Sequence, residues 1–145
     1  REKGSSLIAF VARFSIAAVF WKSGQTKVEG LAVDLIGGTF QLGWPHLAPS
    51  TLPLFRSEYH VPLLSAEVAA HMAAFAEHFF PVLILVGFAT RFSALALLGM
   101  TLTIQLFVYP DAYPTHGTWI ALLMLLMAKG PGCFSIDHLI ARRYR

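Results

Sequence analysis

Charged residues are scarce in this sequence. They make up 13% of its 145 residues, whereas ordinary soluble domains carry about 25%. The formal net charge of +3 is small and concentrated at the chain ends, which argues against a nucleic-acid-binding protein. Hydrophobic residues make up 56%, more apolar surface than a soluble chain of this length can hide, so the composition indicates an integral membrane protein.

Cysteine is nearly absent, since Cys133 is the only one. A single chain therefore holds no internal disulfide, no CxxC redox pair, no CxxCH haem attachment site and no cysteine-based zinc site. The glycines at 37–38 and 130–132 lack the strand-loop-helix context of a phosphate-binding loop. The length of the chain predicts a single domain over residues 1–145.

What the sequence has instead is a set of long apolar runs. About 20 apolar residues cross the hydrocarbon core as a helix, and four runs approach that length. No signal-peptide cleavage site follows residues 7–21, so the first run is expected to be retained as a helix. We predict an all-α, four-helix up-down membrane bundle with helices at about residues 5–23, 65–90, 91–109 and 115–129.

The remaining segments are polar or rich in proline. Residues 25–64 contain no run that could span a bilayer and are predicted to form a long loop outside it. Within that loop, residues 52–64 are expected either to lie along the interface as a short helix or to cover the bundle as irregular chain. Residues 130–145 are predicted to form a tail with a short amphipathic helix. Most basic residues share the side of the two termini, which the positive-inside rule places in the cytoplasm.

Two ionisable residues, Arg13 and Glu77, lie near the middle of the first and second apolar runs. A charge at such a depth is costly and is by default a functional candidate. We expect Arg13 and Glu77 to form a buried ion pair, which either fixes the helix register or forms part of a ligand pocket. His78 follows Glu77 and shares one helix face with Glu67 and His71.

If the pair belongs to a pocket, a quinone or another small substrate is the expected ligand. Reduction of a quinone needs two electrons and two protons, and a His or Glu at mid-depth suits the proton transfer. The electrons are expected to come from a partner protein, because the sequence shows no redox-cofactor motif. The predicted pocket residues are Trp21, Phe75 and Tyr109 as apolar walls, and Lys22, His78 and Gln105 as groups that bind carbonyl oxygens.

Histidine supplies an alternative interpretation. Imidazole and carboxylate groups suit zinc or cupric copper. We therefore also consider a metal site, with Glu67, His71 and His116 as its ligands. No pair of these residues has the short spacing of a metal-binding motif, so this alternative depends on residue type alone.

Three motifs, in the correct order, resemble the DoxX family. The first is Arg13 with Phe20 and the run Gly-Gln-Thr-Lys at 24–27, and the second covers residues 77–91. The third is Lys-Gly-Pro-Gly-Cys-Phe-Ser-Ile-Asp at 129–137, which is similar to the closing GPGxxS[LI]D pattern of the family. The resemblance extends over nearly the whole chain and implies a four-helix protein of the bacterial inner membrane.

The resemblance also implies a range of functions. One branch of the wider family includes the small subunit of thiosulfate:quinone oxidoreductase, and others are linked to thiol and oxidative-stress complexes or to metal-stress gene clusters. Residues 53–64 and 108–116 look like the metal-stress subgroup. Three functions stay open: the membrane subunit of a quinone-linked or thiol/oxidative-stress redox system, a copper- or zinc-handling stress protein, and a non-catalytic structural module. Soluble redox or metal-handling proteins and further copies of the chain are the expected protein partners.

Overall fold

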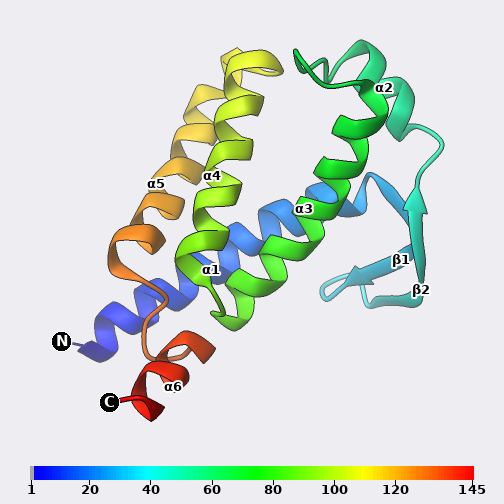
Figure 1. Cartoon of the computed structure of the whole chain (residues 1–145). Helices are drawn as coiled ribbons and strands as arrows, with labels where there is room; N and C mark the ends of the chain where they lie inside the picture. The colour runs from blue at the N-terminus through cyan, green and yellow to red at the C-terminus, as the bar shows by residue number, and fades with distance from the viewer. Residues whose placement is uncertain (1) are drawn as a thin grey trace.

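Four long helices form the body of the protein in the computed structural model, which describes residues 2–145. They are α1 (Glu2–Gln25), α3 (Ala66–Val86), α4 (Thr90–Phe107) and α5 (Tyr113–Lys129). Helix α1 packs along α3, and α4 packs along α5, so the bundle consists of two helix pairs (Figure 1). The core between them is apolar and includes the buried side chains of Ile16, Phe20, Ile84, Leu97, Leu123 and Leu126.

Three of these helices are long and apolar enough to cross a membrane: residues Lys3–Gln25, Ala66–Val86 and Thr90–Phe107. Helix α5 has 17 residues and packs between α4 and α1. Large apolar side chains cover the outward faces of the helices, which is the arrangement that a lipid environment stabilises. On α3 this face repeats every three or four residues and carries Val68, Met72, Phe75, Phe79 and Val82. The predicted class, a helical membrane bundle, is confirmed.

The segment after α1 contains a β-hairpin that the sequence analysis did not predict. Strands β1 (Val28–Asp34) and β2 (Thr39–Leu47) pair in antiparallel register, with an irregularity between Glu29 and Leu31. Asp34 stabilises the connecting turn, because its Oδ1 accepts hydrogen bonds from the backbone N–H groups of Ile36 and Gly37. Most side chains of β2 are exposed, so the strand shows no alternating pattern of burial that a sequence could reveal.

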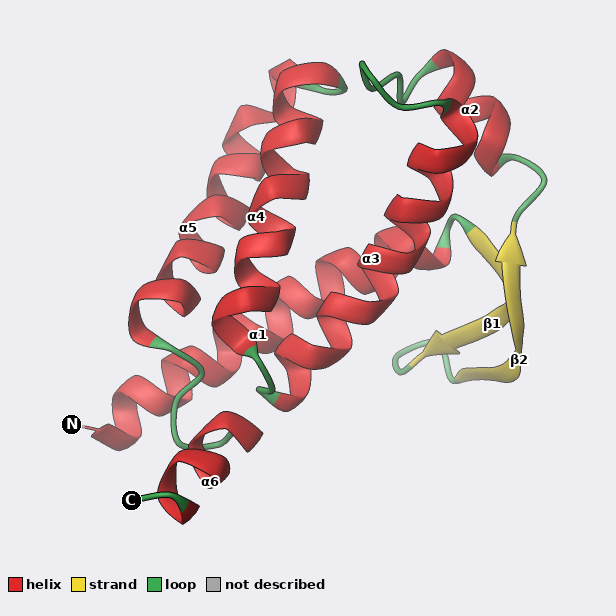
Figure 2. Cartoon of the chain, in the orientation of Figure 1, coloured by secondary structure: helices red, strands yellow, loops and turns green. Residues whose placement is uncertain are grey.

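Three short helices complete the chain (Figure 2). Helix α2 (Thr51–Ser57) lies where the sequence indicated either a short helix or irregular chain, and the 3₁₀ helix η1 (Pro110–Ala112) precedes α5. Helix α6 (Ile136–Arg143) follows the Gly-Pro-Gly turn, and the Ser135 hydroxyl caps its first turn. Both chain ends and α6 lie together at what we call the terminal end of the bundle (Figure 1). The opposite end, which carries α2 and the hairpin, is the hairpin end.

The terminal end is held together by the guanidinium of Arg13, which is 1% exposed. Its Nε donates to the carbonyl of Ile84 at 2.9 Å and its Nη2 to that of Leu85 at 2.6 Å. Its Nη1 donates to the carbonyls of Pro131 and Phe134 at 3.0 and 2.8 Å. The last carbonyls of a helix have no partner within the helix and carry its negative dipole end. Arg13 therefore connects α1 to the C-terminus of α3 and to the turn that follows α5.

The predicted ion pair between Arg13 and Glu77 is wrong. All the hydrogen bonds of the guanidinium go to backbone carbonyls, and Glu77 instead pairs with Lys27. The physical reason is that four carbonyl oxygens, two at the end of α3 and two in the turn after α5, satisfy a buried guanidinium as well as a carboxylate does.

Replacing Arg13 by methionine is expected to destabilise the bundle. The Arg13→Met change removes the side-chain donor of four carbonyl groups, of which that of Ile84 keeps the Gly87 N–H as a donor. Each carbonyl left buried and unsatisfied costs about 1–3 kcal/mol. We expect a loss of about 3 kcal/mol or more in the free energy of unfolding, measured by thermal or denaturant unfolding in detergent. Arg13→Lys should not restore stability, since an ammonium lacks the planar fork of donors. Arg56→Met, at an exposed position, is the control, and equal stability of the two methionine variants would contradict this role for Arg13.

Candidate ligand-binding cavity

A cavity of about 460 Å³ lies between the two helix pairs. All four long helices contribute to its wall, together with Phe55 of α2 and the chain that follows it. Its apolar lining includes Val19, Phe20, Phe80, Met100, Ile104 and Trp119. Its polar lining includes Ser23, Lys27, Tyr59, Glu77, Thr103, Tyr109 and His116. A mainly apolar cavity of this size with a few convergent polar groups is typical of a small-molecule site.

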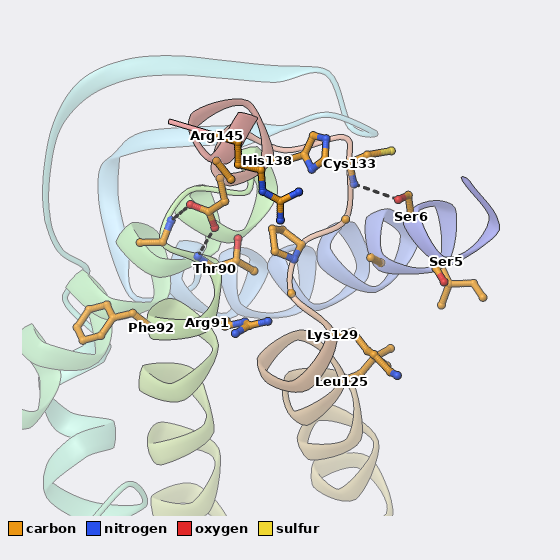
Figure 3. A pocket seen from close by; sticks show the side chains of 18 residues that line it. Ser5, Ser6, Thr90, Arg91, Phe92, Leu125, Lys129, Cys133, His138 and Arg145 are labelled. Carbon is orange, nitrogen blue, oxygen red and sulfur yellow. Dashed lines mark hydrogen bonds between the residues drawn. The ribbon is translucent and has the colours of Figure 1, made fainter. Parts of the chain in front are cut away.

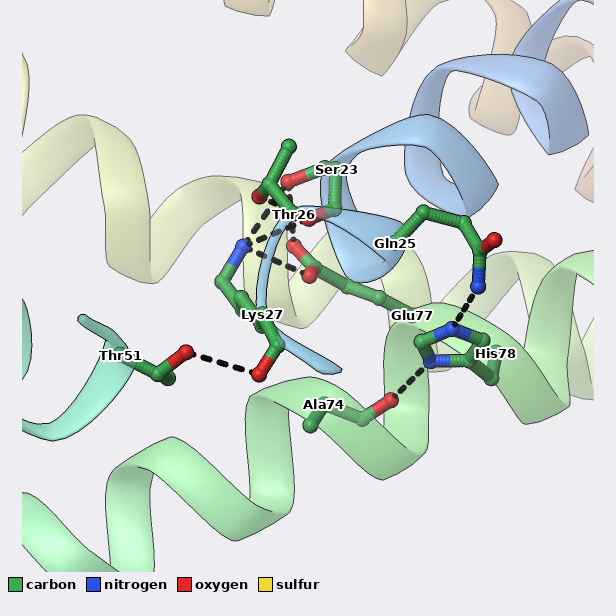
Figure 4. A network of polar contacts seen from close by, with 8 residues as sticks. All are labelled: Ser23, Gln25, Thr26, Lys27, Thr51, Ala74, Glu77 and His78. Atoms are coloured by element: carbon green, nitrogen blue, oxygen red, sulfur yellow. Dashed lines mark hydrogen bonds and ion pairs between the residues drawn. The ribbon is translucent and has the colours of Figure 1, made fainter. Parts of the chain in front are cut away.

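The polar lining includes the ion pair Lys27–Glu77 (Figure 4). The Lys27 Nζ lies 2.8 Å from Oε2 of Glu77, and the two side chains are 12% and 3% exposed. The Ser23 hydroxyl donates to Oε1 of Glu77 at 2.9 Å, while Lys27 also donates to the Ser23 hydroxyl and carbonyl oxygens at 3.0 and 3.2 Å. Every N–H of the ammonium thus has an acceptor, as a buried charge requires.

The chain reaches this arrangement through the turn that ends α1. The N–H groups of Thr26 and Lys27 bond to the carbonyls of Ser23 and Gly24, which turns the chain back over the helix end. Lys27 is therefore directed inwards, whereas Lys22, the predicted pocket lysine, is exposed. The carbonyl of Lys27 accepts hydrogen bonds from Ala48 N–H and the Thr51 hydroxyl, so α2 is fastened to the same turn.

Close contact between α1 and α3 depends on Gly24. A Cβ at this position would lie 2.9 Å from the Cβ of Glu77 and 2.9 Å from the ring of His78. Both distances are shorter than real Cβ contacts, so only glycine allows α3 to approach α1 at this level. The approach places the carboxylate of Glu77 within reach of Lys27.

His78 and Trp21 hold the hairpin. The Nδ1 of His78 donates to the carbonyl of Ala74 at 2.6 Å, which leaves Nε2 to accept from Gln25 at 2.9 Å (Figure 4). Gln25 also bonds to the backbone of Leu31 and Val33, and the indole N–H of Trp21 donates to the carbonyl of Val33. Neither His78 nor Trp21 lines the cavity. Phe75 stacks on Phe79 on the outward face of α3 and does not line it either.

His116, which the sequence analysis grouped with the candidate metal ligands, lies in the wall of the cavity. It is 3% exposed and lines the cavity, and its Nδ1 lies 2.7 Å from Oε1 of Gln105. The amide nitrogen of Gln105 donates to the carbonyl of Pro110, so its oxygen faces His116 and must accept. His116 therefore carries a proton on Nδ1, and in the neutral ring its Nε2 is an acceptor with no partner among the described residues.

Tyr109 closes the cavity near the hairpin end, as one of the predicted wall residues. Its hydroxyl donates to the carboxylate of Glu58, and its ring lies 5.8 Å from that of Tyr59. Burial and the hydrogen bond to Glu58 raise the pKa of the Tyr109 hydroxyl above its usual range. The phenol is therefore a fixed structural contact that joins the end of α4 to the chain after α2.

The residues predicted to bind a metal do not come together. Glu67 is exposed and lies 3.8 Å from Arg56, and His71 is exposed and bonds to the carbonyl of Glu67. His116 is enclosed in the cavity by Gln105 and Trp119. Among residues 2–145, no three His, Cys, Asp or Glu side chains are grouped closely enough to hold a metal ion.

The fold and the cavity define a multi-pass helical membrane protein with a ligand-sized space between its helix pairs. The DoxX family model matches residues 8–110, and the chain belongs to this family. The chain is also 26% identical, over 149 aligned positions, to an uncharacterized protein of Haemophilus influenzae, in a match that covers 97% of this chain and 88% of the relative. No solved structure matches the chain.

The Lys27–Glu77 pair should show strong thermodynamic coupling. Lys27→Met leaves a carboxylate that is 3% exposed without its counter-charge, a change that typically costs about 3–5 kcal/mol. The double variant Lys27→Met/Glu77→Gln removes both charges, and we expect it to regain much of that loss. A double-mutant cycle of unfolding free energies in detergent measures the coupling. Purely additive losses would show that the two charges do not depend on each other.

Gly24→Ala should destabilise the contact between α1 and α3. The added methyl group overlaps Glu77 and His78, and overpacking of this kind costs about 1–3 kcal/mol. The matched control is Gly99→Ala in α4, where an added Cβ meets no atom within 4 Å and alanine favours the helix. We expect the unfolding midpoint in detergent to fall for Gly24→Ala and to stay the same or rise for Gly99→Ala. The same change in both variants would argue against a close approach at Gly24.

Proposed function

We propose that this protein is the membrane subunit of a quinone-linked redox system and that its cavity binds the ring of a quinol. The observation that carries the proposal is the unpaired Nε2 of His116 in an otherwise largely apolar cavity. A quinol is a flat apolar ring with two O–H donors, and a neutral imidazole nitrogen is the acceptor that such a donor needs. Oxidation of the bound quinol then begins with proton transfer from its hydroxyl to His116.

The Lys27–Glu77 pair lines the same cavity. Its two charges offset each other, so the pair adds no net positive charge for the oxygen of a deprotonated quinol, and in the proposed site it is a fixed polar contact of the lining. Complete oxidation releases two protons and two electrons. The protons leave through His116 to solvent, and the electrons pass to a redox centre of a partner protein. This is the reverse of the direction expected from the sequence, in which a partner protein supplies electrons for the reduction of a quinone.

The proposed orientation follows from the basic residues. The terminal end carries Arg91, Lys129, Arg142, Arg143 and Arg145, whereas the hairpin end carries Lys22, Lys27 and Arg56, of which Lys27 is neutralised by Glu77. The positive-inside rule favours a bacterial inner-membrane protein with the terminal end in the cytoplasm and the hairpin end outside. The cavity then lies in the half of the protein near the outer surface.

Tryptophan fluorescence tests the proposal. Trp119 lines the cavity with its ring 5.0 Å from that of His116, so a bound quinone should quench its emission. In a Trp21→Phe/Trp44→Phe background, Trp119 is the only remaining tryptophan. We expect saturable quenching by a short-chain benzoquinone, and displacement of the quinone by the corresponding hydroquinone.

The matched comparison uses two histidines. His116→Leu should weaken binding of the hydroquinone about tenfold, because one good hydrogen bond in a dry site contributes on the order of 1–2 kcal/mol. His71→Leu, at an exposed position outside the cavity, should leave binding unchanged. Quenching that does not saturate, or equal affinities in the two variants, would reject the quinol site and favour a membrane module without a bound ligand.

A further inference from the structure

A second cavity, of about 890 Å³, lies at the terminal end (Figure 3). The start of α1, the start of α4 and the Gly-Pro-Gly turn after α5 surround it, and α6 covers one side. None of its lining residues belongs to the cavity between the helix pairs. Its lining contains the cations Arg91, Lys129 and Arg145, together with His138, and these residues come from different segments of the chain.

These cations are not neutralised by the protein. The acidic residue of the lining is Asp137, and both of its carboxylate oxygens accept hydrogen bonds from the backbone N–H groups of Ala89 and Thr90 at the start of α4. Among side chains 3–145, Arg91 and Lys129 take part in no ion pair. The cavity therefore has an excess of positive charge next to a carboxylate that is already satisfied.

The rest of the lining is apolar and faces outwards. Ile8 and Phe92 are 62% and 64% exposed on the surface that the helices present to lipid, and both line the cavity. The cationic part of the cavity is thus continuous with apolar surface. A molecule with a phosphate group and hydrocarbon chains matches both parts.

We propose that this cavity binds a phosphate group, with Arg91 and Lys129 contacting its oxygens. Charge-assisted hydrogen bonds from arginine and lysine are the usual means of phosphate recognition. The phosphate can be the headgroup of an anionic phospholipid or free in solution, and the two sources share the same contacts. The inference does not depend on the proposed quinol site.

Native mass spectrometry of the full chain, released from detergent, tests the site. The probes are phosphatidylglycerol, diacylglycerol with the same acyl chains, and inorganic phosphate added as a competitor. We expect phosphatidylglycerol to bind and diacylglycerol, which lacks the phosphate, to bind at least about tenfold more weakly. Loss of bound lipid when phosphate is added would identify free phosphate as a ligand, whereas retention of the lipid would identify the headgroup. Either result supports the site.

The control variants separate a built site from general surface charge. Arg91→Gln/Lys129→Gln removes two charges from the cavity, and Arg142→Gln/Arg143→Gln removes two charges from α6 outside it. We expect the first variant to lose at least about tenfold in affinity for phosphatidylglycerol, and the second to lose much less. Lys129→Gln alone, at an exposed position, serves if the double cavity variant does not fold. Equal losses in the two double variants, or equal binding of diacylglycerol and phosphatidylglycerol, would overturn the proposal.

Discussion

The arrangement of this bundle depends on how one buried guanidinium is satisfied. Arg13 donates to carbonyls at the end of α3 and in the turn after α5, so one side chain joins three segments that are far apart in sequence. Asp137 completes the junction by capping the start of α4. A charge in an apolar bundle is costly. Here the guanidinium satisfies backbone carbonyl groups that would themselves be costly to bury without a hydrogen bond. At the terminal end, hydrogen bonds therefore join segments that lie far apart in the sequence.

The hairpin end follows a different principle, because its polar groups are side chains that satisfy one another around a cavity. Lys27 and Glu77 neutralise each other, Gln105 fixes the tautomer of His116, and Tyr109 bonds to Glu58. Within this set, the Nε2 of His116 keeps a free lone pair next to apolar walls. Proton transfer requires an imidazole whose one nitrogen is held by a hydrogen bond and whose other nitrogen is free to accept a proton. This asymmetry is the reason for placing the proposed chemistry there.

The sequence predicted the positions of the long apolar helices well and the partners of the buried polar side chains poorly. Long apolar runs indicate the helices directly, because a helix that crosses a bilayer needs a long run of apolar residues. The partner of Glu77 depends on the turn at Thr26, which directs Lys27 inwards, and hydropathy does not contain that information. The contact of Gln105 with His116 was within reach of sequence reasoning. Gln105 stands two residues before the last residue of α4 and His116 three residues after the first residue of α5, so adjacent antiparallel helices bring them to a similar depth.

The two helix pairs are fastened tightly at one end and loosely at the other. At the terminal end, Arg13 and Asp137 tie both pairs together through backbone hydrogen bonds. At the hairpin end, the contacts of Tyr109 with Glu58 and Tyr59 connect α4 to the chain after α2. Rocking of one pair against the other about the fixed end would change the width of the cavity and leave the packing within each pair intact. A molecule bound in the cavity would then determine the separation of the two helix pairs at the hairpin end.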